Sequence, residues 1–326
     1  MSASEMGKPD IRVDLHVHTR HSRLRSLPAL KARDCYSLPS EVYRRALQRG
    51  MDLVTFTDHD TIDGCLELLD REGPLDNFFI SEEVSTCDPR SGVRFHVSVF
   101  GIDESQHREA QRLRSDVRDL ATYLSREGIP ASLNHVGSSL VRRARSLDEL
   151  MEVVAAFPLI ETRNGAQLPA SNAVAELLAQ RLESDGQPVG RTGGSDAHTT
   201  RRIGWTWTVA KAVDRETFLD ALLAGRVQSE GLSARVAPIL CDAYEIVAKY
   251  YADLVSNRHE HYAPGERRVP AACALVSLPL HLVALPATGT LFRQARVLGA
   301  ARELSRDLAL SLRQSSLAVS AEAEIA

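Results

Sequence analysis

Histidines and carboxylates stand at the ends of segments that alternate like β-strands. In DLHVHT, His16 and His18 lie two residues apart on the polar side of an apolar alternation. Residues of the same chemical kind stand at or near the ends of later strand-like segments, at His59, Glu83, His135, Asp196 and His198, and His96 lies within another such segment. Imidazole nitrogens and carboxylate oxygens without a thiolate suit Zn, Mn or Fe. A carboxylate that can bridge two ions fits a multinuclear centre, which activates water and stabilises the attacking and leaving oxygens of a displacement.

Each motif alone also has a purely structural interpretation. Asp58 or Asp60 could cap a helix that begins near Thr61. The sequence GGSD could form a tight turn, and His135 could be a buried histidine bonded to a backbone carbonyl. We favour a metal site because several separate strand ends carry a ligand-type residue, and clusters of this kind mark functional sites.

Strand-like and helix-like segments alternate over residues 10–235. The expected strands are 11–17, 51–57, 78–85, 93–102, 129–137, 158–165, 188–198 and 205–210. The expected helices are 40–50, 61–69, 104–127, 146–156, 171–183 and 215–224. This order is typical of βαβ units and a parallel sheet. About seven such units favour a closed barrel, in which all strand C-termini face one mouth and bring distant ligands together.

These motifs resemble, in order and spacing, those of the PHP (polymerase and histidinol phosphatase) superfamily. The matching segments are DLHVHT (14–19), TFTDHDTIDG (55–64), Glu83-Val84-Ser85, His96 in FHVSVFGID, His135 in LNHVG, and GGSDAHT (193–199). The resemblance covers about residues 10–235. It implies an α/β fold with a distorted (β/α)7 TIM-like barrel, a di- or trinuclear metal centre, and hydrolysis of a phosphoester by a metal-bound hydroxide. We therefore expect a PHP-type hydrolase barrel at 1–238 and a helical region of unknown role at 239–326.

The resemblance also implies a role for each ligand-type residue. The first metal would be held by His16, His18, Glu83 and Asp196. Glu83 would bridge to a second metal held by His96 and His135, and His59 and His198 would hold a third. Glu83 is preferred to Glu82 because the family's glutamate is followed by one residue and then Ser or Thr. Strand alternation turns only one of these two glutamates inward.

One position departs from the family pattern. Family members usually carry Asp, or sometimes His, seven or eight residues after the first histidine, where this chain has Arg23 and Leu24. His21 is close by at the wrong offset, and Asp34, after a local insertion, is another candidate. We therefore expect two or three divalent ions.

Other polar residues are candidates for catalysis and substrate binding. Asp58 or Asp60 would orient His59 or a bound water, and His198 would assist the leaving group if it holds no metal. Arginines near the mouth would clamp the phosphate oxygens, although a solvated surface role is an alternative for each. These arginines are Arg20, Arg163, Arg201 and Arg202, with Asn164 as a further polar candidate.

Composition narrows the substrate and the setting. The chain has 326 residues, 44% of them hydrophobic and 25% charged, as in globular proteins with a core. Its net charge of -4 argues against a long nucleic acid partner. The five cysteines are scattered, without C-x-x-C spacing, and the N-terminus lacks an apolar stretch, so we expect a cytoplasmic protein without disulfides.

These features predict hydrolysis of a small phosphorylated metabolite or nucleotide. The alternatives are a phosphodiesterase or exonuclease acting on short oligonucleotides, a non-catalytic metal-stabilised interaction module, and metal-assisted hydrolysis of a carboxylic ester or amide.

The C-terminal region contains an uncharged run from Val269 to Phe292. It is long enough to span a bilayer, but Pro270, Pro279 and Pro286 interrupt a simple helix. We expect buried helical segments that pack on the barrel or on a second subunit of a homo-oligomer. Membrane association through residues 269–317 is the less favoured alternative.

Overall fold

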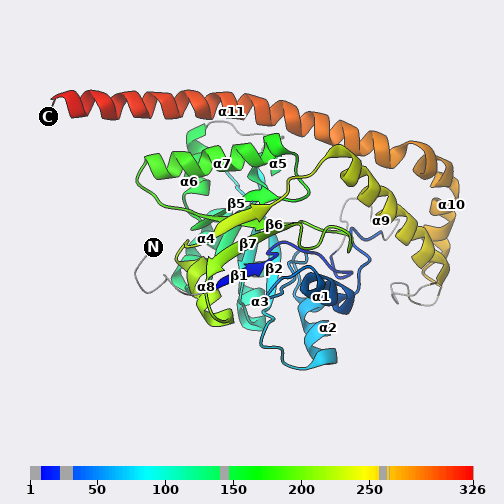
Figure 1. The fold of residues 1–326 in the computed structure, drawn as a ribbon. Coiled ribbons are helices and arrows are strands. Elements are labelled where there is room, and N and C mark those ends of the chain that lie inside the picture. Colours follow the sequence, from blue (N-terminus) through cyan, green and yellow to red (C-terminus); the bar gives the residue numbers. More distant parts are fainter. Residues whose placement is uncertain (1–8, 23–31, 140–146, 257–262, 264, 326) are drawn as a thin grey trace.

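The fold was obtained as a computed structural model, which describes residues 9–22, 32–139, 147–256, 263 and 265–325 (Figure 1). It is a mixed α/β fold, as predicted. One sheet contains, in spatial order, β2 (Ser81–Cys87), β3 (Arg94–Phe100), β4 (Ala131–Asn134), β5 (Leu159–Asn164) and β6 (Gly190–Gly194). The other contains, in spatial order, β1 (Asp10–Val13), β7 (Thr206–Lys211) and β8 (Gln228–Gly231).

The expectation of an entirely parallel sheet is wrong. β4 and β5, and β5 and β6, pair in parallel, but β2 pairs with β3 and β3 with β4 in antiparallel fashion. The physical reason is the link between β2 and β3, residues 88–93, because a parallel crossover needs about a dozen residues or more. The predicted strand 51–57 forms only an isolated bridge between Val54 and Phe78.

Isolated β-bridges also lie beside the candidate site. Val17 bridges to Ala197, and His59 bridges to Glu83. The closed seven-stranded barrel stays a prediction, because the described strands pair as two sheets.

The antiparallel hairpin keeps His96 at the same rim as the other candidate ligands. His96 lies near the start of β3 and pairs with Ser85, which lies near the end of β2. On its other side, His96 pairs with Asn134, the last residue of β4. The start of an antiparallel strand thus occupies the place that a parallel barrel would give to a strand end.

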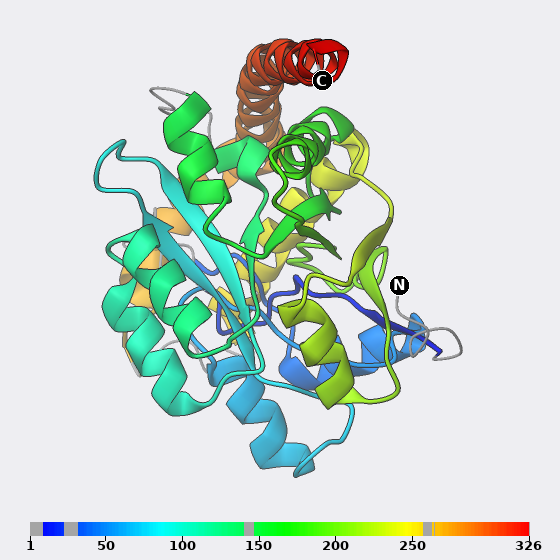
Figure 2. The ribbon, with the colours of Figure 1, turned by 90° about the vertical axis from the view of Figure 1, so that its left-hand side faces the viewer.

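Helices cover the sheets on their outer sides (Figures 1 and 2). They are α1 (Pro39–Gln48), α2 (Asp63–Glu72), α3 (Glu104–Leu113), α4 (Val117–Arg126), α5 (Val136–Ser139), α6 (Leu147–Val154), α7 (Pro169–Ser184) and α8 (Arg215–Leu223). The single helix predicted over 104–127 is two helices. Asp116 accepts a hydrogen bond from the backbone N–H of Arg118 and so caps a new helix at that point.

The described part of the C-terminal region contains α9 (Val236–Ser256), α10 (Arg268–Val283) and α11 (Leu285–Ile325). α11 runs alongside α7 in Figures 1 and 2, and its Ala301 and Leu308 join the main apolar core. Most side chains of the uncharged run do not pack on the rest of the chain as described, and Val276 is 82% exposed. Their packing on a second subunit stays a prediction. α10 has no charged side chain after Arg268, and among its described side chains only those of Pro270 and Ala274 are fully buried.

Candidate metal centre

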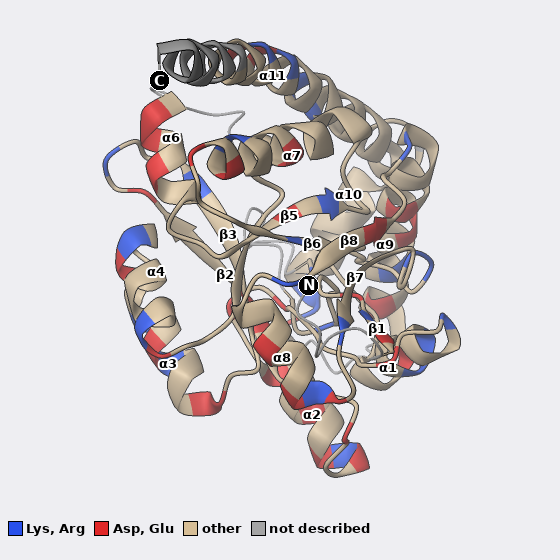
Figure 3. Cartoon of the chain, turned by 60° about the vertical axis from the view of Figure 1, so that its left-hand side comes forward, with Lys and Arg blue, Asp and Glu red and all other residues tan. Residues whose placement is uncertain are grey.

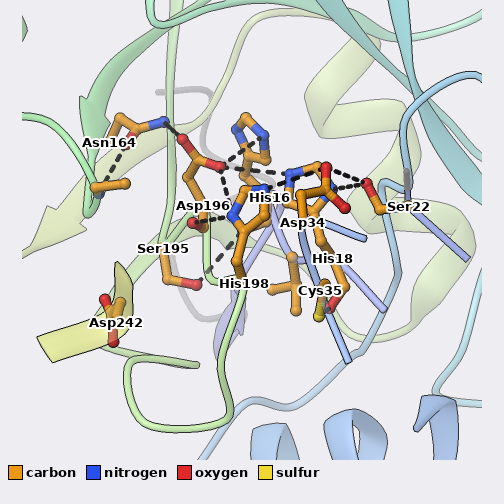
Figure 4. A network of polar contacts seen from close by, with 12 residues as sticks. His16, His18, Ser22, Asp34, Cys35, Asn164, Ser195, Asp196, His198 and Asp242 are labelled. Atoms are coloured by element: carbon orange, nitrogen blue, oxygen red, sulfur yellow. Dashed lines mark hydrogen bonds and ion pairs between the residues drawn. The ribbon is translucent and has the colours of Figure 1, made fainter. Parts of the chain in front are cut away.

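The structure brings the predicted ligand residues together. His16, His18, Asp196, His198 and Asp34 surround one point in Figure 4. Sets of nitrogen and oxygen atoms close enough to share a cation are His16/His18/Asp196, His16/Glu83/His135, His59/Glu83/His96 and His18/His59/His198. Segments spread over some 180 residues of the sequence therefore meet at one rim, as a barrel mouth requires.

Glu83 occupies the middle of the cluster. Its Oε2 lies 3.0 Å from His59 Nδ1, 3.3 Å from His16 Nε2 and 3.6 Å from His18 Nε2. Its Oε1 lies 3.1 Å from His135 Nε2 and 3.2 Å from His96 Nδ1. The side chain is fully buried. The carboxylate thus has a different group of imidazoles on each oxygen, which is the arrangement that bridging two ions needs.

Strand alternation separates Glu83 from its neighbour. Glu82 points away from the cluster toward α3, where its Oε1 lies 2.9 Å from His107 Nδ1. Its Oε2 accepts a hydrogen bond from Gln111 Nε2 at 2.7 Å. Of the two adjacent glutamates, only Glu83 faces the histidines of the candidate metal centre.

Asp196 and Asp34 supply carboxylates to two further sides of the cluster. Asp196 Oδ1 lies 3.4 Å from His18 Nε2 and 3.5 Å from His198 Nδ1. Asp34 Oδ2 lies 3.7 Å from His198 Nε2 and 3.8 Å from His59 Nε2. Asp34 therefore lies beside His59 and His198, the two residues predicted to hold a third metal.

Arg23 and Leu24, which occupy the usual family positions, lie outside the described residues. Ser22 precedes them and donates a hydrogen bond from its Oγ to Asp34 Oδ2 at 3.0 Å. His21 instead lies 2.7 Å from Glu67 Oε2 through its Nε2.

Several buried polar atoms of the cluster fit a cation. Among the described residues, His16 Nε2, His18 Nε2, His59 Nδ1 and Glu83 Oε2 have no hydrogen-bond partner. Buried polar atoms are normally paired, and each unpaired one needs an explanation. A divalent ion would satisfy imidazole nitrogens and carboxylate oxygens together, so the donor set fits Zn, Mn or Fe.

The pKa values of the cluster are shifted by burial and by the charges of neighbouring groups. Burial alone would raise the pKa of Glu83, but the imidazoles of His16 and His59 hold it well below its ordinary value. The pKa of Asp196 is likewise held well below its ordinary range by His16 and His18, against the effect of burial. Burial dominates at His59 and lowers its pKa to about 3. The carboxylates are therefore ionised and His59 is neutral, which are the forms that bind metal ions.

Three residues beside the centre have left-handed backbone conformations that are unusual for side chains with a Cβ. The φ angles are +30° at His135, +49° at Asp196 and +54° at Asp60. Such conformations cost about 1–3 kcal/mol each and persist where the surrounding structure enforces them. Asp60 is held by a hydrogen bond from the backbone N–H of Ser85 to its Oδ1, at 2.7 Å.

Sequence reasoning missed Glu161, which orients two of the histidines. Its Oε1 lies 2.8 Å from His16 Nδ1, and its Oε2 accepts a hydrogen bond from the backbone N–H of His135 at 2.9 Å. Asn164 Nδ2 donates to Glu161 Oε2 and to Asp196 Oδ2. No local signal marked it, because Glu161 lies in the middle of the predicted strand 158–165 and its partner His16 is 145 positions away in the sequence. A register shift between Glu161 and Arg163 alters the alternation of β5 there.

Asp58 acts on a different neighbour from the one expected. Its carboxylate accepts hydrogen bonds from the backbone N–H and the Oγ1 of Thr19, both at 2.6 Å, and so anchors the chain just after His18. A Cβ at Gly64 would lie 2.3 Å from Asp58 Oδ2, so glycine leaves room for this contact. Burial raises the pKa of Asp58 to about 7.

The predicted phosphate-binding arginines are held by groups of the protein. Arg20 Nη2 lies 2.7 Å from Glu67 Oε2, and Arg201 Nη2 lies 2.9 Å from Glu245 Oε2. Arg163 Nη1 donates to the carbonyl oxygen of Gly231, and Arg202 Nη1 donates to that of Gly165. Their role in binding phosphate stays a prediction.

The chain is similar to known proteins in sequence and in fold. A family model described as PHP-associated matches residues 170–227, which include the GGSDAHT motif. This match agrees with the family resemblance of the motifs. The uncharacterized protein MJ1587 of Methanocaldococcus jannaschii is 32% identical over 78 residues, which are 23% of this chain and 46% of that protein. The chain therefore matches about half the length of this relative.

Solved structures are also similar to this chain. PsfC from Pseudomonas syringae PB-5123 has 18% identity and a TM-score of 0.45, with 74% of this chain and 97% of that chain covered. An amidohydrolase from Chromobacterium violaceum has 18% identity and a TM-score of 0.44, with 66% of this chain and 96% of that chain covered.

Proposed function

We propose that this chain, a member of the PHP superfamily, hydrolyses the phosphoester of a small phosphorylated metabolite or nucleotide with the help of divalent cations. The observation that carries the proposal is the position of Glu83. Its two buried carboxylate oxygens lie 3.0–3.6 Å from imidazole nitrogens on different sides of the cluster. An isolated buried ion pair does not need so many surrounding imidazoles.

The cations would be held in the groups that the resemblance implies. His16, His18, Glu83 and Asp196 form the first group, and Glu83, His96 and His135 form the second. His59 and His198 form the third group, and we add Asp34 to it because its Oδ2 lies 3.7–3.8 Å from both rings. Cations in these places would lower the pKa of a bound water and neutralise charge on phosphoryl oxygens.

The chain itself orients the groups that would hold the cations. Glu161 accepts a hydrogen bond from His16 Nδ1, which leaves Nε2 of that ring directed at Glu83 and Asp196. A hydrogen bond that fixes the proton on Nδ1 sets the tautomer of the ring and leaves Nε2 free to bind a cation. Asp58 is a positioning residue that acts through Thr19 on the segment carrying His18.

His198 is suited to proton transfer at the edge of the cluster. Its side chain is 23% exposed, whereas His16 and His18 are buried. Its Nδ1 donates to the carbonyl oxygen of Asp196 at 3.1 Å, which fixes the ring. We assign it delivery of a proton to the leaving oxygen when its Nε2 holds no cation. The net charge of -4 supports a small substrate over a long nucleic acid.

The test combines elemental analysis of the purified protein with hydrolysis of aryl phosphate monoesters, aryl phosphate diesters and aryl acetates. Bound Zn, Mn or Fe and turnover of a phosphate ester are expected. Glu83→Gln should lose both, and Glu82→Gln is the matched control because it changes the adjacent carboxylate that faces α3. A metal-free protein, or one that cleaves only acetates, would contradict the proposal.

A further inference from the structure

α10 and the first turns of α11 expose a continuous series of large apolar side chains. Val276 is 82% exposed, Leu275 72% and Phe292 67%. Also exposed are Val269, Leu280, Leu282, Leu285 and Leu291. We call this set the apolar ridge. Contiguous apolar surface of this kind on a protein marks an interaction site.

The ridge is not the outer half of an amphipathic helix. The residues between Val269 and Phe292 include no Asp, Glu, Lys or Arg, so α10 has no charged face to turn toward water. A helix that is apolar all round belongs in a protein core or in lipid. α10 buries only Pro270 and Ala274 fully, so the fold as described does not provide that core.

Arginines stand at both ends of the uncharged run. Arg267 and Arg268 precede it, and Arg293 and Arg296 follow it. The sequence from Arg267 to Arg302 contains no acidic residue, although the whole chain has a net charge of -4. The arginines of α11 appear as blue bands in Figure 3. Arg296 lies over the exposed ring of Phe292, 5.8 Å from its centroid, so the apolar and cationic groups are adjacent.

The two helices together have the length and composition of a lipid-associated segment. Among the described residues, no single helix is long and apolar enough to cross a membrane. The pair Arg268–Leu282 and Leu285–Leu312, bent by 65°, is long and apolar enough when the two helices are taken together. A bent pair that exposes its apolar residues near the bend suits insertion into the headgroup region of one leaflet.

We propose that the apolar ridge docks on the surface of a membrane that contains anionic phospholipids. The exposed leucines, valines and phenylalanine would enter the acyl boundary, and the flanking arginines would contact the lipid phosphates. A second copy of the chain is a poorer occupant. A two-fold contact places the same patch on both sides, which would bring together arginines with no acidic residue between positions 267 and 302.

The test uses the full chain in a vesicle sedimentation assay. Vesicles of phosphatidylcholine alone are compared with vesicles that also contain phosphatidylglycerol, and we expect binding to the anionic vesicles that weakens as salt is added. The double variant Leu275→Glu/Val276→Glu should lose about tenfold or more in vesicle affinity, because both apolar insertion and charge attraction are removed. Leu232→Glu is the matched control, since Leu232 is 62% exposed but lies outside the ridge.

A second double variant, Arg293→Gln/Arg296→Gln, separates the two contributions. It should lose the preference for anionic over neutral vesicles and keep the helical content measured by circular dichroism. Absence of binding to the anionic vesicles would overturn the proposal. So would equal binding by the Leu275→Glu/Val276→Glu variant, or a wild-type dimer in light scattering that the same variant converts to monomer.

Discussion

Asp242 of α9 accepts a hydrogen bond from Thr199 Oγ1 at 3.0 Å, and Thr199 directly follows His198. Asp242 is also ion-paired with Arg202, whose Nη1 donates to the carbonyl oxygen of Gly165. Figure 4 shows Asp242 on the Ser195 side of the cluster. The C-terminal helical region, which had no role on sequence grounds, thus fixes the loop that carries Asp196 and His198.

Removing this anchor should loosen the loop without unfolding the protein. Asp242→Ala is expected to lower metal affinity by about ten- to a hundredfold, as for other residues that orient metal ligands. Asp242→Asn keeps an acceptor for Thr199, so its metal affinity should lie between those of Asp242→Ala and the wild type. Metal titration followed by calorimetry measures the effect. Glu245→Ala is the control, because Glu245 pairs with Arg201 and Lys249 instead, and equal affinities of Asp242→Ala and this control would refute the coupling.

The contact between Glu161 and His16 predicts a second effect on metal binding. Glu161→Gln keeps the size of the side chain but removes the charge that accepts from His16 Nδ1. We expect about a ten- to hundredfold loss of metal affinity, because the ring loses its fixed tautomer. The readout is competition with a chromogenic chelator. Glu176→Gln, on the exposed side of α7 where it pairs with Arg191, should bind like the wild type.

Asp34 predicts the number of ions. If its carboxylate completes the group with His59 and His198, Asp34→Ala should release one equivalent of metal and leave the ions held around Glu83 in place. Elemental analysis after dialysis at matched protein concentration gives the stoichiometry. Asp63→Ala removes an exposed carboxylate at the start of α2 and serves as the control. An unchanged stoichiometry in Asp34→Ala would exclude this residue from the centre.

The candidate ligands could be predicted even though the strand directions were partly wrong. A ligand residue near either end of a strand can lie at the same rim of the sheet. His96 was assigned to a parallel strand and lies in an antiparallel one, yet its position near the start of β3 brings it to the same rim. Glu161 was missed because its role depends on a pairing with His16 across 145 positions of sequence. No local pattern encodes such a pairing.

The environment of the uncharged run was beyond sequence reasoning for a different reason. The apolar composition of Val269–Phe292 predicts that these side chains are shielded from water. It does not distinguish shielding by protein from shielding by lipid. The split of the predicted helix 104–127 has a local cause that the sequence does contain, since Asp116 is a typical N-cap residue.

Backbone proximity makes Gly194 indispensable beside the centre. A Cβ at this position would lie 2.3 Å from His16 Cβ and 2.6 Å from His16 N. Gly194→Ala should therefore force β6 away from His16 and destabilise the protein by about 1–3 kcal/mol, as overpacking does. Denaturant unfolding measures this change. Gly299→Ala is the contrasting control, since a Cβ at this position would meet nothing within 4 Å. An alanine in place of a helical glycine should raise the free energy of unfolding by about 0.5–1 kcal/mol.

Asp88 provides a test of pH-dependent stability away from the metal centre. Burial alone would raise its pKa, but hydrogen bonds from Ser91 and Arg90 and the charge of Arg118 lower it. A carboxyl whose pKa is lower in the folded than in the unfolded state stabilises the fold above its ordinary pKa. That contribution disappears as the pH falls through the lowered value.

Asp88→Asn should accordingly reduce the free energy of unfolding at neutral pH by about 1–3 kcal/mol, the usual cost of losing a buried charged acceptor. The difference from the wild type should shrink as the solution is acidified below the ordinary pKa of aspartate, because the wild-type carboxyl is then protonated as well. Urea unfolding across this pH range measures the two curves. Asp52→Asn, which changes the carboxylate that accepts from the backbone N–H of Arg12, is a surface control for general charge effects. A difference that stays constant down to strongly acidic pH would show that Asp88 stabilises through packing and not through its charge.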